Sequence, residues 1–360
     1  MKPSHFLHPL LILILLCTRT SAQTPIPFDS PRWTIKADSA TRETFDGRDA
    51  LRIIKGAATL PDAHFTNGII EFDIAFHQKR SFPGIRFRIQ DSANAENYYL
   101  RPHQSGNPDA QQYYPEYNGS GSWQLYYGEG FNNAHTLPFD HWLHIKMLIS
   151  GSRAEIYFDN ENTPALYVSH LLRPLAEGMI QLQNGYDQPA WFANFTMTPM
   201  PSVPLLNAPV TPPTLPETMV KTWQVSQPFA ESDIENRVRH PNLLHWEKFA
   251  ADFRGISDLS SLTNVTMTTN TIICRLDVDA PQDIVKKLSF GFSDRVRVYC
   301  NGKLLYTGAD VFMSRDYRFL GTIGFFDAVF PELKKGHNEI WLAISEDYGG
   351  WGVQARLDSL

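Results

Sequence analysis

The chain has 360 residues, of which 42% are hydrophobic and 19% are charged, so it is long enough to build two hydrophobic cores. Its formal net charge of −6 argues against a nucleic-acid partner, because nucleic-acid binding needs a basic surface that displaces counterions from phosphates. We therefore expect globular domains with no nucleic-acid ligand.

Residues 1–22 have the features of a cleavable secretory signal peptide. Lys2 supplies a positive charge, Phe6–Leu16 is almost wholly apolar, and Thr20-Ser21-Ala22 places small residues before a cleavage point. The apolar run is shorter than the roughly 20 residues that span a bilayer. We expect simple cleavage, a secreted or periplasmic location, and no membrane insertion of the mature chain. Lipid attachment at Cys17 is the alternative.

A proline-rich segment divides the mature chain. Seven prolines lie between Pro199 and Pro216, and proline removes a backbone donor and favours extended conformations. We interpret residues 199–218 as a semi-rigid linker between a first domain at 24–198 and a second domain at 219–360.

Both halves of the chain show the period-two pattern of half-buried strands. Apolar and polar residues alternate over 70–76, 85–90 and 154–159. In the second half, residues 296–306 form two alternating runs around Asn301-Gly302, which suits a type I′ hairpin turn because both residues tolerate positive φ. No long helical period is present. The sequence therefore predicts an all-β fold class with two antiparallel β-sandwich (jelly-roll) domains.

Several motifs of the first domain follow the order of a known family. They are NGIIEFDI at 67–74, WLHIK at 142–146, AEIYFD at 154–159 and AWFANF at 190–195. With these motifs the domain resembles concanavalin A-like lectin/glucanase domains, which include laminin G-like modules and domains described as 3-keto-disaccharide hydrolases. The motifs are strand-and-turn patterns, so the resemblance implies a fold more than a function.

The second domain resembles a galactose-binding-like jelly roll. The residues that carry this resemblance are SDRVRVYCNG at 293–302, LKKGHN at 333–338 and GGWG at 349–352. Such domains often accompany secreted carbohydrate-active enzymes, so the resemblance implies a supporting role for this half of the chain.

The segment from Glu96 to Tyr127 mixes aromatic, amide and charged side chains densely. Sugar recognition needs that mixture, because an aromatic face packs on the apolar face of a pyranose while polar groups bond its hydroxyls. We predict that this segment binds an oligo- or polysaccharide. The candidate ligand-binding residues are Glu96, Arg101, His103, Asp109, Gln112, Tyr113, Tyr117, Asn118, Trp123 and Tyr126.

The alternation of side chains along a strand predicts on which face of the sheet some of these residues lie. Arg101 and His103 lie on the same side of an extended strand, whereas Trp123 and Gln124 face opposite sides, so only one of the latter pair need point to a ligand. The alternative is that the aromatic residues fill core edges and cross-strand ladders. The clustering of polar partners with the rings favours a ligand surface.

Three functions stay open for this surface. The first is a secreted carbohydrate-binding protein without chemistry. The second is a glycoside hydrolase or 3-keto-disaccharide hydrolase, for which Glu96, Asp109, Glu116 and Glu129 offer carboxylates and His103 offers an acid or base, with no catalytic residue assigned. The third is a laminin G-like adhesion module, which more often presents a flatter apolar patch to a protein.

One departure from laminarinase-type relatives argues against their mechanism. Those relatives carry Glu-x-Asp-x-x-Glu on one strand. Glu71 and Asp73 begin that spacing here, but Phe76 occupies the third position. The absent carboxylate favours binding over hydrolysis, and we interpret Glu71 and Asp73 as a solvent-facing pair.

Metal and cofactor signals are weak. The 12 histidines are scattered and show no zinc-binding spacing, so we expect no cofactor. Structural calcium is common in both resembled folds. Asp187 and Asp294 are candidate ligands for such an ion, although each residue also suits a turn or a strand entry.

Three further residues of the second domain carry predictions. We expect Trp351 to pack inside the sandwich, because the residues after it continue its strand phase. Cys274 and Cys300 lie on the apolar phase of their strands, so they form either a disulfide or two buried thiols.

Overall fold

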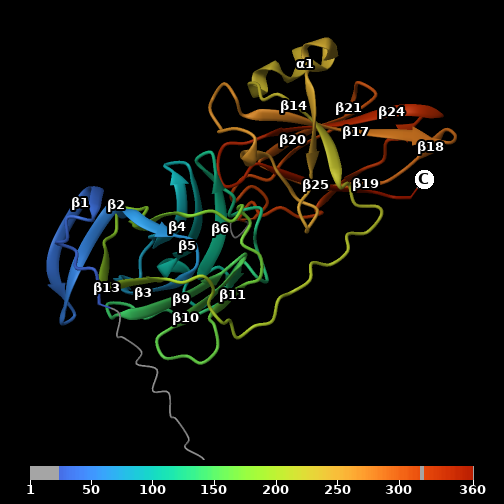
Figure 1. Cartoon of the computed structure of the whole chain (residues 1–360). Coiled ribbons are helices and arrows are strands. Elements are labelled where there is room, and N and C mark those ends of the chain that lie inside the picture. Colours follow the sequence, from blue (N-terminus) through green and yellow to red (C-terminus); the bar gives the residue numbers. More distant parts are fainter. Residues whose placement is uncertain (1–23, 317–319, 360) are drawn as a thin grey trace, which may run out of the picture.

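The computed structural model describes residues 24–316 and 320–359, and over these residues the fold is all-β, as the sequence predicts. The signal peptide expected at residues 1–22 lies outside the described residues. Figure 1 shows two β-rich bodies side by side, one coloured blue to green and the other orange to red, with the proline-rich segment crossing between them. Within the described ranges, no helix is long and apolar enough to cross a membrane.

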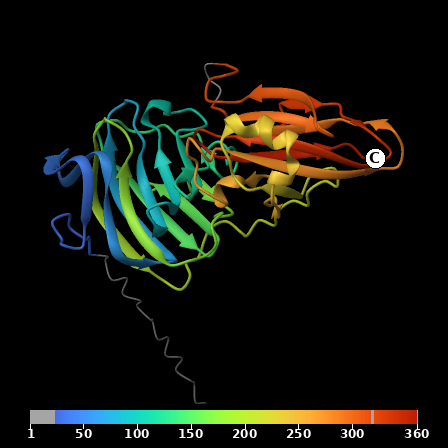
Figure 2. The ribbon, with the colours of Figure 1, turned by 90° about the horizontal axis from the view of Figure 1, so that it is seen from above.

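The first body is one continuous antiparallel sheet of 13 strands that curls on itself (Figure 2). Its main path runs β11-β10-β9-β3-β13-β2-β12-β4-β5-β6-β7, while β1 pairs with β2 and β8 pairs with β6. The strands are β1 (Thr34–Phe45), β2 (Arg48–Phe65), β3 (Gly68–Phe76), β4 (Pro83–Asp91), β5 (Asn94–Leu100), β6 (Gln111–Tyr117), β7 (Ser120–Gly121), β8 (Asn132–Asn133), β9 (Leu143–Ser150), β10 (Arg153–Phe158), β11 (Leu166–Val168), β12 (Gly178–Asn184) and β13 (Ala190–Pro199).

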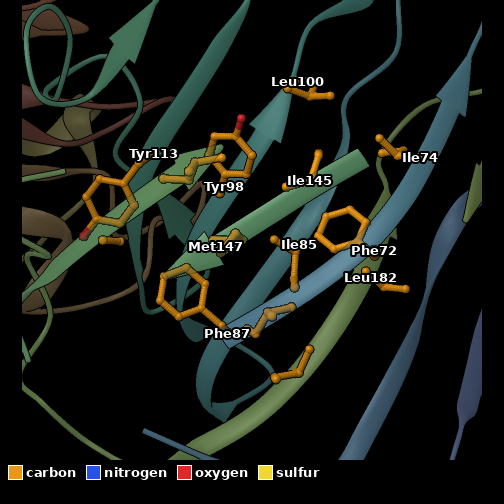
Figure 3. Packing of buried hydrophobic residues seen from close by; sticks show 14 of the residues in the cluster. Phe72, Ile74, Ile85, Phe87, Tyr98, Leu100, Tyr113, Ile145, Met147 and Leu182 are labelled. Carbon is orange, nitrogen blue, oxygen red and sulfur yellow. The ribbon is translucent and has the colours of Figure 1, made fainter. Parts of the chain in front are cut away.

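The inner face of the curled sheet forms the core of the first domain. Phe72 of β3, Ile85 and Phe87 of β4 and Tyr98 of β5 gather there and are at most 1% exposed (Figure 3). Burying each such side chain contributes about 1.5–3 kcal/mol. Because side chains alternate along a strand, the intervening residues of β4 and β5 face outwards and form a second, polar surface.

The second body is a sandwich of two sheets, ordered β15-β14-β17-β24-β20-β21 and β16-β25-β19-β22, with β18 and β23 as a separate ribbon. Trp351 is fully buried in its core, and its indole N–H donates to the Ile344 carbonyl at 3.0 Å, which confirms the predicted packing. The strands are β14 (Thr222–Ser226), β15 (Trp246–Ala250), β16 (Ser257–Asp258), β17 (Thr271–Ala280), β18 (Ile284–Val285), β19 (Leu288–Ser293), β20 (Arg295–Cys300), β21 (Lys303–Ala309), β22 (Asp327–Val329), β23 (Glu332–Leu333), β24 (Gly336–Ser345) and β25 (Gly352–Leu357).

Helices among the described residues are short. They are η1 (Pro102–Gln104), η2 (Glu231–Asp233), η3 (Pro241–Leu243) and η4 (Leu259–Ser261), all 3-10, and α1 (Ile234–Arg239). The hairpin predicted around Asn301-Gly302 joins β20 to β21, and both turn residues have positive φ, 49° and 78°. These values fit the type I′ turn that the residue pair favours.

The first part of the proline-rich segment is bound to the first domain rather than free in solvent. Glu155 of β10 accepts hydrogen bonds from the backbone N–H groups of Leu206 at 3.0 Å and Asn207 at 2.6 Å. The Tyr167 hydroxyl donates to the Ala208 carbonyl at 2.8 Å. Although burial opposes it, this set of hydrogen bonds lowers the pKa of Glu155. The segment is therefore a strap fixed along β10 and β11.

The two cysteines of the second domain are separate buried thiols. Cys274 lies in β17 and Cys300 ends β20, and neither forms a disulfide. Burial raises the pKa of both thiols. Of the two alternatives drawn from the sequence, the structure has the buried thiols.

Candidate functional site

A pocket of about 420 Å³ lies where the outer face of the first sheet meets loops of the second domain. Concave sites of this size, with mixed aromatic and polar walls, are typical of small-molecule binding. The lining residues from the first domain are Arg80, Phe82, Tyr99, Arg101, His103, Gln104, Asp109, Tyr114, Trp123, Gln183 and Gly185. Those from the second domain are Phe312, Leu320 and Tyr348.

Successive side chains of β5 point to opposite faces of the sheet, so one of its two tyrosines lies in the core and the other in the pocket. Tyr98 points inwards, and its hydroxyl donates to Gln111 Oε1 at 2.7 Å. Tyr99 points outwards into the pocket, and its hydroxyl donates to Gln112 Oε1 on the neighbouring β6 at 3.2 Å. Tyr114 of β6 meets the Tyr99 ring edge-on, with centroids 5.3 Å apart. The period of two thus makes Tyr99 and Tyr114 an aromatic wall of the pocket.

Arg101 is wedged beside this wall. Its guanidinium carbon lies 4.6 Å from the ring centroid of Tyr99 and 5.6 Å from that of Trp123. Its Nη2 donates to Gln112 Oε1 at 2.6 Å, and its Nη1 donates to the Asp109 carbonyl at 3.0 Å. Gln112 is itself fixed, because its amide donates to the Trp123 carbonyl at 2.8 Å. These contacts hold Arg101, which is only 5% exposed, in a defined position at the pocket.

A second group of lining residues is arranged around Phe82. Its ring centroid lies 6.0 Å from that of Tyr99 and 5.4 Å from that of His103, and the Arg80 guanidinium lies 5.7 Å from it. Burial, assisted by the charges of Arg80 and Arg101, lowers the pKa of His103 to about 4. The imidazole is therefore neutral at pH 7 and offers one hydrogen-bond donor and one acceptor.

Asp109 brings a carboxylate to the pocket. It is 5% exposed, and burial raises its pKa even though Arg101 acts in the opposite direction. Among the lining residues that the structure describes, Asp109 is the sole carboxylate. Gln183 adds an amide that is fixed by donation to Asn97 Oδ1 at 2.9 Å. The pocket therefore presents guanidinium, imidazole, carboxylate and amide groups between aromatic rings.

Trp123 stands between this pocket and a second hollow of about 320 Å³. Tyr114, Trp123 and Tyr348 line both hollows, and the Trp123 and Tyr348 ring centroids are 6.4 Å apart. Asn118 and Asp347 lie on the second hollow alone. The two hollows thus share an aromatic ridge to which both domains contribute.

Gln124, the residue after Trp123, docks the two domains. It is fully buried, its Nε2 donates to the Leu320 carbonyl at 2.9 Å, and the Ser293 hydroxyl donates to its Oε1 at 3.3 Å. Its backbone N–H also donates to the Gly349 carbonyl at 2.8 Å. Trp123 lines the pocket while Gln124 enters the second domain, and both residues belong to a turn rather than to the extended strand that their sequence suggested.

Neighbouring contacts strengthen this docking. The Ser122 hydroxyl donates to the Asp258 carboxylate at 2.6 Å, and the Asn118 amide donates to the Ser260 carbonyl at 2.8 Å. Burial raises the pKa of Asp258 to about 6. Because both contacts join residues more than a hundred positions apart, the pocket is made by the docked chain and not by the first domain alone.

Half of the ten predicted ligand-binding residues lie at or under the pocket. Arg101, His103, Asp109 and Trp123 line it, and Gln112 supports Arg101 from behind. Their proximity follows from the pairing of β5 with β6 and from the turn after β7.

The other five predicted residues lie elsewhere. Asn118 lines the second hollow, and Tyr117 donates its hydroxyl to the Leu172 carbonyl outside both hollows. Glu96, Tyr113 and Tyr126 lie inside the first domain and are 0%, 1% and 3% exposed, so a ligand at the surface does not reach them. We therefore leave these three residues out of the site.

Glu96 shares the inward phase of Tyr98, which explains its burial. Its Oε2 accepts a hydrogen bond from the Tyr113 hydroxyl at 2.6 Å. Burial raises the pKa of Glu96 to about 7, against the opposing influence of Tyr113 and of the nearby Arg88. The segment is polar as a whole, so its sequence did not indicate that the Glu96 carboxyl group lies on the core side of its strand.

Ten of the fourteen lining residues are not among the predicted ligand-binding residues. Arg80 and Phe82 lie in the loop before β4, and Gln183 sits at an ordinary polar position of β12. Phe312 and Tyr348 come from the second domain. For Tyr348 the only sequence feature nearby was the flexible Gly349-Gly350 pair that follows it. This pair did not indicate that Tyr348 would contact the first domain.

Glu71 and Asp73 do not form the solvent-facing pair that was expected. The Asp73 side chain is 5% exposed, pairs with Arg48, and accepts hydrogen bonds from His144 Nδ1 at 2.7 Å and Asn194 Nδ2 at 2.6 Å. Against the effect of burial, these partners lower the pKa of Asp73. Hydrogen bonds to Asp73 and Glu71 raise the pKa of His144 to about 9. This network lies on the outer face of β3 and β9, away from the pocket residues.

A candidate group of metal ligands lies on the second domain. Asp277, His337 and Glu339 bring one ligand atom each within 4.8 Å of one another. Arg275 occupies the same oxygens, with Nε 3.2 Å from Asp277 Oδ1 and Nη1 3.4 Å from Glu339 Oε1. This ion pairing accounts for the carboxylates without a metal.

The residues expected as calcium ligands lie in different settings. Asp294 is 1% exposed, and its Oδ2 accepts the backbone N–H of Asp347 at 3.0 Å, so it anchors the entry to β20. Asp187 is exposed in the turn between β12 and β13. In the described part of the chain, neither belongs to a group of three acidic or histidine ligands.

No family model and no curated protein matches this chain. Similar solved structures include the carbohydrate-binding module CBM66 from Bacillus subtilis, at 20% identity and a TM-score of 0.36, covering 46% of this chain and 94% of that one. Another is a Bacillus subtilis protein of unknown function with a galectin-like fold, at 13% identity and a TM-score of 0.33, covering 46% and 88%. A third is domain 4 of AbnA, a GH43 extracellular arabinanase from Geobacillus stearothermophilus, in complex with arabinotriose, at 12% identity and a TM-score of 0.31, covering 49% and 84%. Likenesses at this level carry no information about a ligand of this chain.

Proposed function

We propose that this chain is a secreted carbohydrate-binding protein that holds a glycan in the pocket between its two domains. The main support for this proposal is that Tyr99, Tyr114 and Trp123 line the same pocket as the polar side chains of Arg101 and His103. Aromatic faces pack on the apolar face of a sugar ring, and the fixed polar groups select the direction of its hydroxyls. Export is part of the proposal because of the signal-peptide features of residues 1–22.

The polar groups favour binding over hydrolysis. Glycoside hydrolysis usually needs two carboxyl groups beside the scissile bond, and among the described lining residues Asp109 is alone in this respect. His103, with a pKa lowered to about 4, is not a proton donor at neutral pH. The second candidate function, a hydrolase, therefore lacks a partner for Asp109 in this pocket.

The second domain has a direct role in the proposal. Tyr348 extends the aromatic ridge of Trp123, and Phe312 and Leu320 close the pocket on that side. A glycan in the pocket would touch both domains at once. The first domain, separated from the second, is expected to bind more weakly because part of the wall is then absent.

Replacing Trp123 with alanine tests the proposal. We expect glycan affinity to fall by about 1–3 kcal/mol, because the ring supplies a stacking face. Trp142→Ala is the matched control, since Trp142 is also half-buried but packs beside Phe45 and does not line the pocket. Titration calorimetry gives the affinities and thermal melting gives the stabilities. Equal affinity of the Trp123 variant and the wild type, at an unchanged melting temperature, would contradict the site.

A further inference from the structure

Two arginine side chains, Arg80 and Arg101, give the pocket an excess of positive charge. Within residues 24–316 and 320–359, neither of them has a carboxylate oxygen at ion-pair distance. Five other arginines of the first domain do have one, for example Arg48 with Asp73 and Arg86 with Glu116 at 2.9 Å. The described arginines Arg88, Arg153 and Arg173 instead donate to uncharged acceptors. With Asp109 as its sole described carboxylate, the pocket thus carries more positive than negative side chains, on a chain whose net charge is −6.

Arg101 is the more unusual of the two. It is 5% exposed, and buried charges are normally paired because desolvating an ion is costly. Its hydrogen-bond acceptors are uncharged, namely the Asp109 carbonyl and the Gln112 amide oxygen. The rings of Tyr99 and Trp123 on either side compensate part of the cost by cation–π contact. The site is built to hold a guanidinium at the pocket rather than to neutralise it.

Arg80 is exposed, yet it is also positioned. Its guanidinium lies 5.7 Å from the ring centroids of both Phe82 and Tyr186. Burial is the main cause of the low pKa of His103, and the charges of the two arginines lower it further. The opposing charge in the pocket is that of Asp109, so two guanidinium groups are present for one carboxylate.

We propose that the pocket binds an acidic sugar unit, whose carboxylate or sulfate group is received by Arg101 and Arg80 while its ring packs on the aromatic wall. This inference rests on the proposed function and narrows its ligand to anionic glycans. The planar guanidinium matches either anion through two parallel N–H···O bonds. His103 and Gln183 are then available for the uncharged hydroxyls of the same sugar.

The test compares acidic and neutral forms of one glycan. Titration calorimetry with oligogalacturonate, with its methyl ester and with a sulfated oligosaccharide measures the preference for charge and identifies which anion is preferred. We expect the wild type to bind one acidic form at least about tenfold more tightly than the ester, with a preference that shrinks as salt is raised.

Arg80→Gln and Arg239→Gln make the matched pair of variants. Both remove one exposed positive charge, but Arg239 lies at the end of α1 and does not line the pocket. We expect Arg80→Gln to lose about five- to tenfold in affinity for the acidic glycan and to lose less for the ester, while Arg239→Gln changes neither. Arg101→Lys, which keeps the charge but loses the planar fork, is expected to lower the acidic preference as well.

The outcomes separate the two proposals. If the ester or another neutral glycan binds as tightly as the acidic forms and Arg80→Gln has no effect, the acidic ligand is refuted while glycan binding stands. If no glycan, acidic or neutral, binds to the folded wild type, the proposed function itself fails. A preference for the sulfated over the carboxylated form supports the anion site and assigns its ligand.

Discussion

Substituting Gly349 by alanine is expected to loosen the docking of the two domains at the pocket. Gly349 has a φ of +107°, and a Cβ atom there would lie 2.0 Å from Gln124 Oε1 and 2.5 Å from its Cδ. Gln124 is fully buried, so it has no free space to move into. It would have to leave the Leu320 carbonyl and the Ser293 hydroxyl.

The magnitude has two parts. An L-residue held at this positive φ costs about 1–3 kcal/mol. Breaking the buried hydrogen bonds of Gln124 costs about a further 1–3 kcal/mol. Gly336→Ala is the matched control for the first part, because Gly336 has a φ of +93° and a Cβ atom there would meet no other atom within 4 Å. The difference between the two variants in unfolding free energy therefore reports the docking contribution of Gln124.

Calorimetric unfolding together with glycan titration makes the comparison. We expect the Gly349 variant to unfold at a lower temperature than the Gly336 variant and to bind glycan more weakly, because Leu320 and Tyr348 shift with the second domain. Gln124→Ala removes the same docking contacts but leaves the sequence of the loop that carries Tyr348 unchanged, and it should reproduce the loss of glycan affinity. Equal melting temperatures of the two glycine variants, with wild-type affinity in both, would refute the docking argument.

Three further predictions concern stability. Glu155→Ala removes the acceptor of the Leu206 and Asn207 N–H groups, and we expect a loss of about 2–4 kcal/mol and faster proteinase K cleavage within 199–218, read by mass spectrometry. The pKa of His144 is raised from 6.5 to about 9, so its contribution is complete below pH 6.5 and lost as pH rises through 9; melting temperatures across this range should fall in the wild type and stay flatter in His144→Gln. The pKa of Glu96 is raised from 4.5 to about 7, so its contribution is complete below pH 4.5 and lost as pH rises through 7; Glu96→Gln should melt at a higher temperature than the wild type above pH 7 and show no advantage below pH 4.5.

The alternation of apolar residues was sufficient to predict the strands. β3, β4 and β10 fall on the runs that showed period two, and the Asn301-Gly302 turn joins β20 to β21. These features depend on neighbours along the chain, which is why sequence alone reveals them.

The candidate site was predictable only in part. The segment from Glu96 to Tyr127 does supply Arg101, His103, Asp109 and Trp123 to the pocket. The strand phase that places Tyr99 outwards turns Glu96 into the core, and the density of polar residues in the segment concealed this difference.

The contribution of the second domain could not be predicted. Gln124 meets Leu320 across 196 positions of sequence, and no local pattern encodes that contact. Tyr348 reaches the pocket because the domains dock, and the proline-rich segment gave no sign that its first part is fixed to β10 through Glu155. Contacts of this kind depend on the tertiary arrangement rather than on local sequence.

The most direct test of the central claim is chromatography of a broad oligo- and polysaccharide panel after incubation with the purified mature chain. We predict that at least one glycan is retained by the protein and recovered intact, and that Trp123→Ala releases it. Shortened products that disappear with Asp109→Asn would contradict the account and establish a hydrolase, and the absence of any retained glycan would contradict glycan binding altogether.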